Sequence, residues 1–247
     1  MDADRIMEIV NGLDHETYES MGKVIFGHEM WIENASEDQG RFSADLMYGH
    51  NMVSDGTAPR EYVNPVVLDS EGNPIPSEVS EIRNGYRISF EGNGRMPYTM
   101  YVESLPVTWN HINDGTWRAG LKRDFSDVKS SASYHMCAKA VFADSAPSAT
   151  EQTLLEIISD RPCLEEGCGV GFRVLYEGRP LSGKEMKAFC RGTGREAYGR
   201  TDDAGEVSFR IDHAGEWMFL MRHRDSDKFV EDEFDETVLI TTLVMRS

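Results

Sequence analysis

The sequence predicts an all-β protein made of two tandem antiparallel β-sandwiches, immunoglobulin-like or transthyretin-like, with a short N-terminal helix. Three observations indicate this fold class. Apolar and polar residues alternate along many short segments, as they do in half-buried strands. Turn sequences such as Asn-Gly and Asn-Asp-Gly separate these segments at short intervals. No ten-residue helical pattern lies between the later segments, as a parallel sheet with crossover helices would require.

The first expected element is an amphipathic helix within residues 1–22. The apolar residues that recur there at helical spacing are Ile6, Ile9, Val10 and Leu13. Asp2 or Asp4 can cap its first turn. We expect this helix to pack on the domain that follows.

Residues 23–142 are expected to form the first sandwich. Period-two alternation over residues 24–32 and again over 42–50 predicts two strands. Asn84-Gly85 is the strongest hairpin signal, because both central residues of a type I′ turn need positive φ. A further strand is predicted over residues 133–142.

The segment 143–150 is small, polar and without periodicity, which predicts a linker between domains. Residues 151–247 then return to the β pattern and are expected to form the second sandwich. Its predicted strands cover residues 154–158, 171–176, 185–190, 206–211, 217–222 and 237–244.

The charge of the chain restricts its partners. Forty-three acidic residues against 25 basic ones give a formal net charge of −18, which repels phosphate backbones and anionic lipid surfaces. Nucleic acid is therefore not expected as a partner. The apolar stretches are far shorter than the roughly 20 residues that cross a bilayer, so no transmembrane segment is expected. The first ten residues do not have the pattern of a secretory signal, which leaves two interpretations open: a cytoplasmic protein, or a chain whose signal has been removed.

The local motifs of common enzymes are absent from the sequence. There is no GxSxG, HExxH or Walker loop, and the glycines at 167–171 and 192–194 neither continue as GxGxxG nor open a predicted helix. We therefore expect a protein that is not an enzyme. An enzyme with a dispersed site is the last-ranked alternative, because catalytic groups gathered from distant loops leave no local pattern.

Two histidines have the same local context. His28 and His50 each follow a glycine, and each has a methionine two residues later. Each histidine continues the apolar alternation of its strand, near a strand end where glycine lets another group approach closely. Imidazole with carboxylate neighbours suits first-row ions such as nickel, cobalt, copper or zinc. We predict that His28 and His50 meet across neighbouring strands and begin a metal site.

Two imidazoles need further ligands, and the sequence offers Glu29, His111 and His135 as candidates. Cys137 lies on the same face of its predicted strand as His135, because side chains two residues apart share a face. For each of these residues taken singly, a structural role is the stronger interpretation, since a sheet histidine is more often hydrogen-bonded structure than a metal ligand.

The N-terminal half resembles a domain family of unknown function that is related to extracytoplasmic accessory proteins of nickel and cobalt uptake transporters. The segments that carry the resemblance are His28-Glu-Met-Trp31-Ile32, Tyr48-Gly49-His50 and Met136-Cys-Ala-Lys139-Ala-Val141. The resemblance implies an extracytoplasmic protein that binds nickel or cobalt and acts in its uptake or delivery, with a membrane transporter complex as partner. Zinc and copper are the alternative ions. Family members often place the first histidine near the mature N-terminus, whereas 27 residues precede His28 here.

The C-terminal half is similar to transthyretin-like and carboxypeptidase-regulatory-like sandwiches. The matching segments are 172–188, 201–209 and 214–217. Such sandwiches serve many proteins as passive modules, so this resemblance specifies the fold and not the function. The alternative function is therefore a non-catalytic tandem module that binds a protein or a glycan, in which the histidines are structural.

Overall fold

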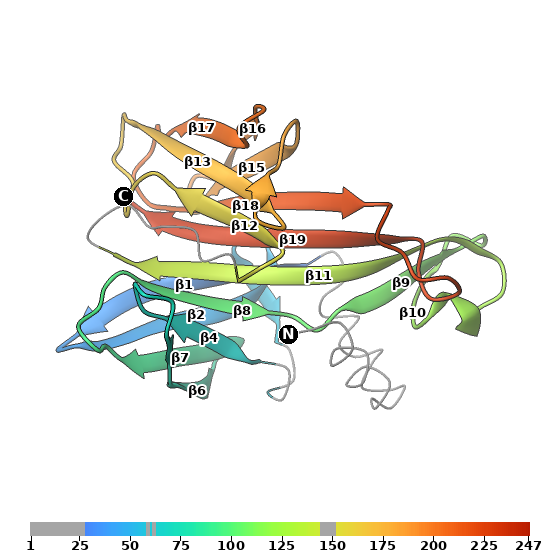
Figure 1. The fold of residues 1–247 in the computed structure, drawn as a ribbon, viewed down its shortest axis with the longest axis horizontal. Helices are drawn as coiled ribbons and strands as arrows, with labels where there is room; N and C mark the ends of the chain where they lie inside the picture. The colour runs from blue at the N-terminus through green and yellow to red at the C-terminus, as the bar shows by residue number, and fades with distance from the viewer. Residues whose placement is uncertain (1–27, 58–59, 61–62, 144–151) are drawn as a thin grey trace.

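The computed structural model describes residues 28–57, 60, 63–143 and 152–247 (Figure 1). The prediction of an all-β fold is confirmed for these residues, whose helical structure is confined to short turns such as the 3-10 turn η2 (Lys122–Asp124). The helix expected within residues 1–22 and residues 144–150 of the expected linker lie outside the described part of the chain. None of the described helical segments is long and apolar enough to cross a membrane.

The strands form three sheets. The N-terminal sheet contains β1 (Glu29–Asp38), β2 (Arg41–His50), β7 (Gly85–Glu91) and β6 (Ser77–Ile82) in spatial order, with β3 (Val53–Gly56) paired to β2. The C-terminal sheet contains β12 (Leu155–Ser159), β13 (Gly169–Tyr176), β14 (Arg179–Pro180) and β17 (Glu206–Arg210).

The central sheet has ten strands drawn from both halves of the chain. Its spatial order is β16 (Arg195–Arg200), β15 (Glu185–Cys190), β18 (Glu216–Asp225), β19 (Glu236–Arg246), β11 (Val128–Phe142), β8 (Tyr98–Glu103), β4 (Pro65–Leu68) and β5 (Pro74–Ile75). The remaining two strands, β9 (Val107–Ile112) and β10 (Trp117–Ala119), continue beside β11. Figure 1 shows β19 and β11 of this sheet between β13 and β17 of the C-terminal sheet above and the strands of the N-terminal sheet below.

The two faces of the central sheet bury different cores. Met136 of β11 and Ile240 of β19 belong to a cluster that also contains the buried side chains of the N-terminal sheet. Leu239 of β19 and Phe219 of β18 belong to a second cluster that contains the C-terminal sheet. Because successive residues of a strand point to opposite faces, adjacent residues of β19 enter different cores. The predicted boundaries at 23–142 and 151–247 stay a prediction, but the central sheet and the first of these cores draw residues from either side of the linker.

One strand pair departs from the antiparallel pattern. Strands β11 and β19 pair in parallel, from Ala132 opposite Glu236 to Lys139 opposite Leu243. Local alternation does not reveal this pairing, because the two strands are distant in sequence.

The hairpin predicted at Asn84-Gly85 is present between β6 and β7, with its turn one residue earlier than expected. Ile82 pairs with Gly85, so the central residues of the turn are Arg83 and Asn84, and Asn84 has a φ of 62°. Gly85 already belongs to β7, where a Cβ atom would lie 2.4 Å from the Leu46 carbonyl oxygen. The glycine is therefore needed for the close approach of β2.

A buried ion pair joins the central and C-terminal sheets. Lys139 of β11 donates to the Glu156 carboxylate of β12 and to the Ile157 carbonyl oxygen, and the two charged side chains are 4% and 2% exposed. Removing one partner of a buried pair leaves the other charge desolvated, whereas replacing both with apolar groups avoids that penalty.

We expect Lys139→Met to lower the free energy of unfolding by about 3 kcal/mol, because the Glu156 carboxylate then stays buried without the Lys139 cation. The double variant Lys139→Met/Glu156→Leu should recover most of this loss. Urea denaturation of the three proteins measures both effects. A single variant as stable as the wild type would show that the pair does not hold the sheets together.

Candidate metal centre

The turn between β2 and β3 shapes one half of the candidate site. His50 pairs with Val53 around a two-residue turn at Asn51 and Met52, whose φ angles are 48° and 59°. Positive φ at both central residues is typical of a type I′ turn, which matches the twist of paired strands. At Gly49, before the turn, a Cβ atom would lie 1.9 Å from the Val53 carbonyl oxygen. Only glycine allows the strands to approach this closely.

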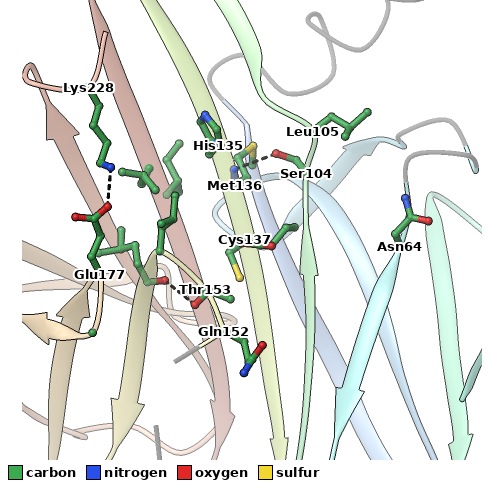
Figure 2. Close-up of a pocket in the computed structure, with 16 residues that line it drawn as sticks. Asn64, Ser104, Leu105, His135, Met136, Cys137, Gln152, Thr153, Glu177 and Lys228 are labelled. Atoms are coloured by element: carbon green, nitrogen blue, oxygen red, sulfur yellow. Dashed lines mark hydrogen bonds and ion pairs between the residues drawn. The ribbon is translucent and has the colours of Figure 1, made fainter. Parts of the chain in front are cut away.

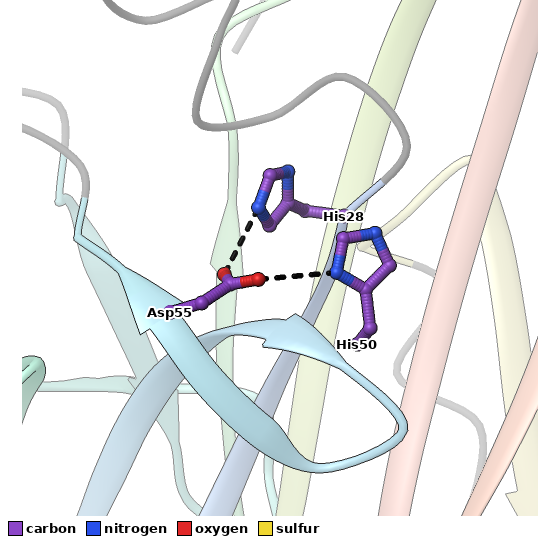
Figure 3. A group of neighbouring side chains, drawn as sticks. All are labelled: His28, His50 and Asp55. Carbon is purple, nitrogen blue, oxygen red and sulfur yellow. Dashed lines mark hydrogen bonds and ion pairs between the residues drawn. The ribbon is translucent and has the colours of Figure 1, made fainter.

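A β-bulge places the carboxylate of the site. The pairing of β3 with β2 skips one residue between Ser54 and Gly56, and Asp55 is that additional residue. A bulge bends its strand and changes the direction of the bulged side chain. In Figure 3 the Asp55 carboxylate points toward the rings of His28 and His50.

The two histidines come from the same end of neighbouring strands. Glu29 of β1 pairs with Gly49 of β2, so His28 and His50 each lie one residue beyond this pair. Their ring centroids are 4.5 Å apart, at an interplanar angle of 42°. The prediction that these rings meet across neighbouring strands is confirmed.

One carboxylate spans both rings. His28 Nε2 lies 2.9 Å from Asp55 Oδ1, and His50 Nδ1 lies 3.2 Å from Asp55 Oδ2 (Figure 3). Each of the three residues offers one ligand atom within 4.8 Å of the other two. In the described part of the chain, no other group of three or more histidine, cysteine or acidic side chains is this close. Two imidazole nitrogens and a carboxylate oxygen are a donor set that first-row divalent ions accept.

The site is open to solvent. The side chain of His28 is 17% exposed, while those of His50 and Asp55 are 54% and 49% exposed. Three protein ligands at an exposed position leave further coordination positions to water or to another donor, unlike the closed four-ligand shell of a structural zinc site. Such an arrangement allows an ion to enter and leave.

The other three candidate ligands lie outside this cluster. The Glu29 carboxylate accepts the backbone N–H of Asn51 at 2.7 Å, so it supports the turn. The ring of His111 in β9 stacks on Trp117, with centroids 4.6 Å apart. His135 lies in β11, where its Nε2 is 3.3 Å from the Ser133 hydroxyl oxygen.

His135 lines a separate pocket of about 520 Å³ between β11, β12 and the loop after β18 (Figure 2). Its neighbours there include Glu103 and Cys137, and a Lys228–Glu177 ion pair closes one side. Desolvation lowers the pKa of His135 to about 4, and the positive charge of Lys228 acts in the same direction. His135 is therefore a neutral ring at physiological pH.

Sequence reasoning did not identify Asp55. The residue precedes a glycine at the end of a short segment, where aspartate is ordinary turn chemistry, and period-two alternation does not show a bulge. The sequence does place Asp55 five residues after His50, across a turn. This short separation is the feature that could have indicated it as a third ligand.

Comparison with known proteins identifies the family. A model described as a domain of unknown function (DUF4198) matches residues 25–225. The chain belongs to this family. The matched region includes all three residues of the site. No match is found among curated proteins.

Three similar solved structures are distant likenesses of this chain. A pullulanase from Anoxybacillus sp. LM18-11 shares 7% identity over 79% of this chain at a TM-score of 0.19, and this chain covers 23% of the pullulanase chain. The D0-D1 domain of intimin shares 12% identity over 85% of this chain and 91% of its own, at a TM-score of 0.22. An Escherichia coli alpha-2-macroglobulin fragment spanning domains MG0-NIE-MG1 shares 12% identity over 90% of this chain and 73% of its own, at 0.23.

We expect the pH dependence of stability to reveal the neutral state of His135. The unfolded histidine takes up a proton near its ordinary pKa of about 6.5, whereas the folded one does so only near 4. Between these values the unfolded state binds more protons, so stability falls as the pH falls, by up to roughly 1.4 kcal/mol per pH unit. His135→Leu should therefore lose less stability than the wild type between pH 6.5 and 4 in urea titrations. Equal slopes for the two proteins would contradict this assignment.

Proposed function

We propose that this protein binds a divalent transition-metal ion between His28, His50 and Asp55 and acts in metal uptake or delivery. The single observation that carries the proposal is the convergence of the three donor atoms within 4.8 Å. Strand pairing brings His28 and His50 together at one sheet end, and the bulge in β3 adds Asp55, which regular pairing would not bring there.

The chemistry of the donors supports a first-row ion. Imidazole suits nickel, copper and zinc, and the carboxylate adds a negative charge that favours any divalent cation. The open coordination positions suit an ion that is carried and released. The preference for nickel or cobalt, and for a membrane transporter complex as partner, comes from the family resemblance of the histidine segments and belongs to the proposal.

We expect the full chain, without a histidine tag, to bind Ni²⁺ or Co²⁺ with micromolar or tighter affinity in calorimetry at pH 7.5. Each of His28→Ala, His50→Ala and Asp55→Ala should weaken binding at least about tenfold, or about 1.4 kcal/mol, because each removes one of three ligands. His111→Ala is the matched control, since its ring stacks on Trp117, and it should leave the affinity unchanged.

The absence of any heat of binding with Ni²⁺, Co²⁺, Cu²⁺ or Zn²⁺ would remove the metal function. The three residues would then be a structural cluster, and a protein- or glycan-binding module would become the better hypothesis.

Metal affinity should also decrease below about pH 6, because an imidazole nitrogen coordinates only after it has lost its proton. Titrations with Ni²⁺ at pH 7.5 and pH 5.5, under conditions in which circular dichroism shows an unchanged fold, measure this effect. Equal affinity at the two pH values would show that the histidines are not the ligands.

A further inference from the structure

The turn of the candidate site is held by basic side chains from the C-terminal half of the chain. Lys187 Nζ of β15 donates to the Asn51 side-chain oxygen at 2.7 Å. Arg191, one residue after β15, donates from Nη2 to the Met52 carbonyl oxygen at 3.0 Å. Asn51 and Met52 lie directly after His50, so these contacts act on the backbone that carries one ligand and leads to the next.

The two cations are themselves fixed by carboxylates. Arg191 pairs with Glu33 of β1 and, at 2.8 Å, with Glu216 of β18. Lys187 pairs with Glu196 of β16 at 2.7 Å. Glu33 is only 7% exposed and also accepts the indole N–H of Trp31. A side chain that is paired on several sides loses its freedom to move, and it therefore holds what it contacts in one position.

The turn needs this support. Met52 has a φ of 59°, a left-handed conformation that costs a residue with a side chain roughly 1–2 kcal/mol. Asn51 tolerates such a φ better, and its backbone N–H is held by Glu29. Contacts at the Asn51 side chain and the Met52 carbonyl therefore select this turn from the alternatives open to the hairpin.

We propose that Lys187 and Arg191 are positioning residues of the metal centre, which fix the direction of His50 and Asp55 by holding Asn51 and Met52. This inference rests on the proposed metal function. The C-terminal half is then a working part of the site and not a passive module.

The charge of Lys187 and its positioning contact with Asn51 predict opposite effects of a Lys187 substitution on metal affinity. A lysine cation near a metal ion repels it, so removing the lysine charge alone would tighten metal binding. Removing a positioning contact would weaken binding, because the ligands no longer converge. The direction of the change therefore separates the two roles.

The experiment is a double-mutant cycle on the affinity for Ni²⁺. Lys187→Met removes the donor. Asn51→Gly removes the acceptor and keeps a residue that accepts positive φ. Each single variant should weaken binding about tenfold, the low end for outer-shell partners of metal ligands. The double variant should be no weaker than either single variant, because both remove the same contact.

Two further readouts exclude a merely structural role. The absorption spectrum of bound Co²⁺, which reports ligand geometry, should change in Lys187→Met, and Lys187→Arg should restore both the spectrum and most of the affinity. Lys184→Met is the matched control, because Lys184 lies directly before β15, where its backbone hydrogen-bonds to Thr201, and it should leave binding unchanged.

The outcomes separate the two proposals. A wild type that binds no metal overturns both. A wild type that binds metal, with Lys187→Met unchanged or tighter, overturns the positioning role and leaves the metal function intact. Additive losses in the double variant would also overturn it, because they would show that Lys187 and Asn51 act independently.

Discussion

The last strand of the chain lies in the middle of the fold. Strand β19 pairs in parallel with β11 on one side and antiparallel with β18 on the other, and its alternate residues enter opposite cores, as Leu239 and Ile240 do. The core against the N-terminal sheet therefore contains side chains from both halves of the chain, such as Met136 and Ile240. The buried residues of the other core all come from the C-terminal half, with Val141 packed against them. Burial of apolar surface is the main favourable term in folding, and β19 contributes buried residues to both cores. The two halves of the chain are therefore joined through β19. The structure of a site at their junction depends on both halves.

The candidate metal centre lies at such a junction. His28 directly precedes β1 and His50 ends β2. The turn beside His50 receives hydrogen bonds from Lys187 and Arg191 of the C-terminal half. Thr242 of β19 adds a contact from the same direction, donating to the Met30 carbonyl oxygen at 2.6 Å. The chain has a net charge of −18, and Lys187 and Arg191 are both paired with carboxylates. These ion pairs hold the contact between the two halves in a defined geometry. Two of the ligands, His50 and Asp55, are thus half-exposed, while Lys187 and Arg191 hold the turn that connects them.

Local pattern was enough to predict much of this arrangement. Period-two alternation located β2 at residues 42–50 almost to the residue, and two histidines beyond glycines at strand ends could be expected to meet if those strands were neighbours. The missing features all depend on register or on distant pairing. Asp55 enters the site through a bulge, the Asn84 turn is displaced by one residue because Gly85 is needed against β2, and the parallel pairing of β11 with β19 leaves no trace in either segment. Alternation specifies which residues share a face, but it does not specify which strand lies opposite.

The contrast between His28 and His135 shows why residue type alone does not define a metal site. In the pocket of β11, desolvation lowers the pKa of His135 and raises the pKa values of Glu103 and the Cys137 thiol. All three shifts favour the neutral forms, and a thiol or carboxyl group must lose its proton before it binds a metal ion. That pocket therefore disfavours a cation, although it gathers the residue types that bind metals elsewhere. At His28 and His50, the Asp55 carboxylate is half-exposed, so it does not carry the desolvation cost of a buried charge. Solvent exposure, which weakens most electrostatic interactions, is thus a condition of the metal function that we propose for these three donors.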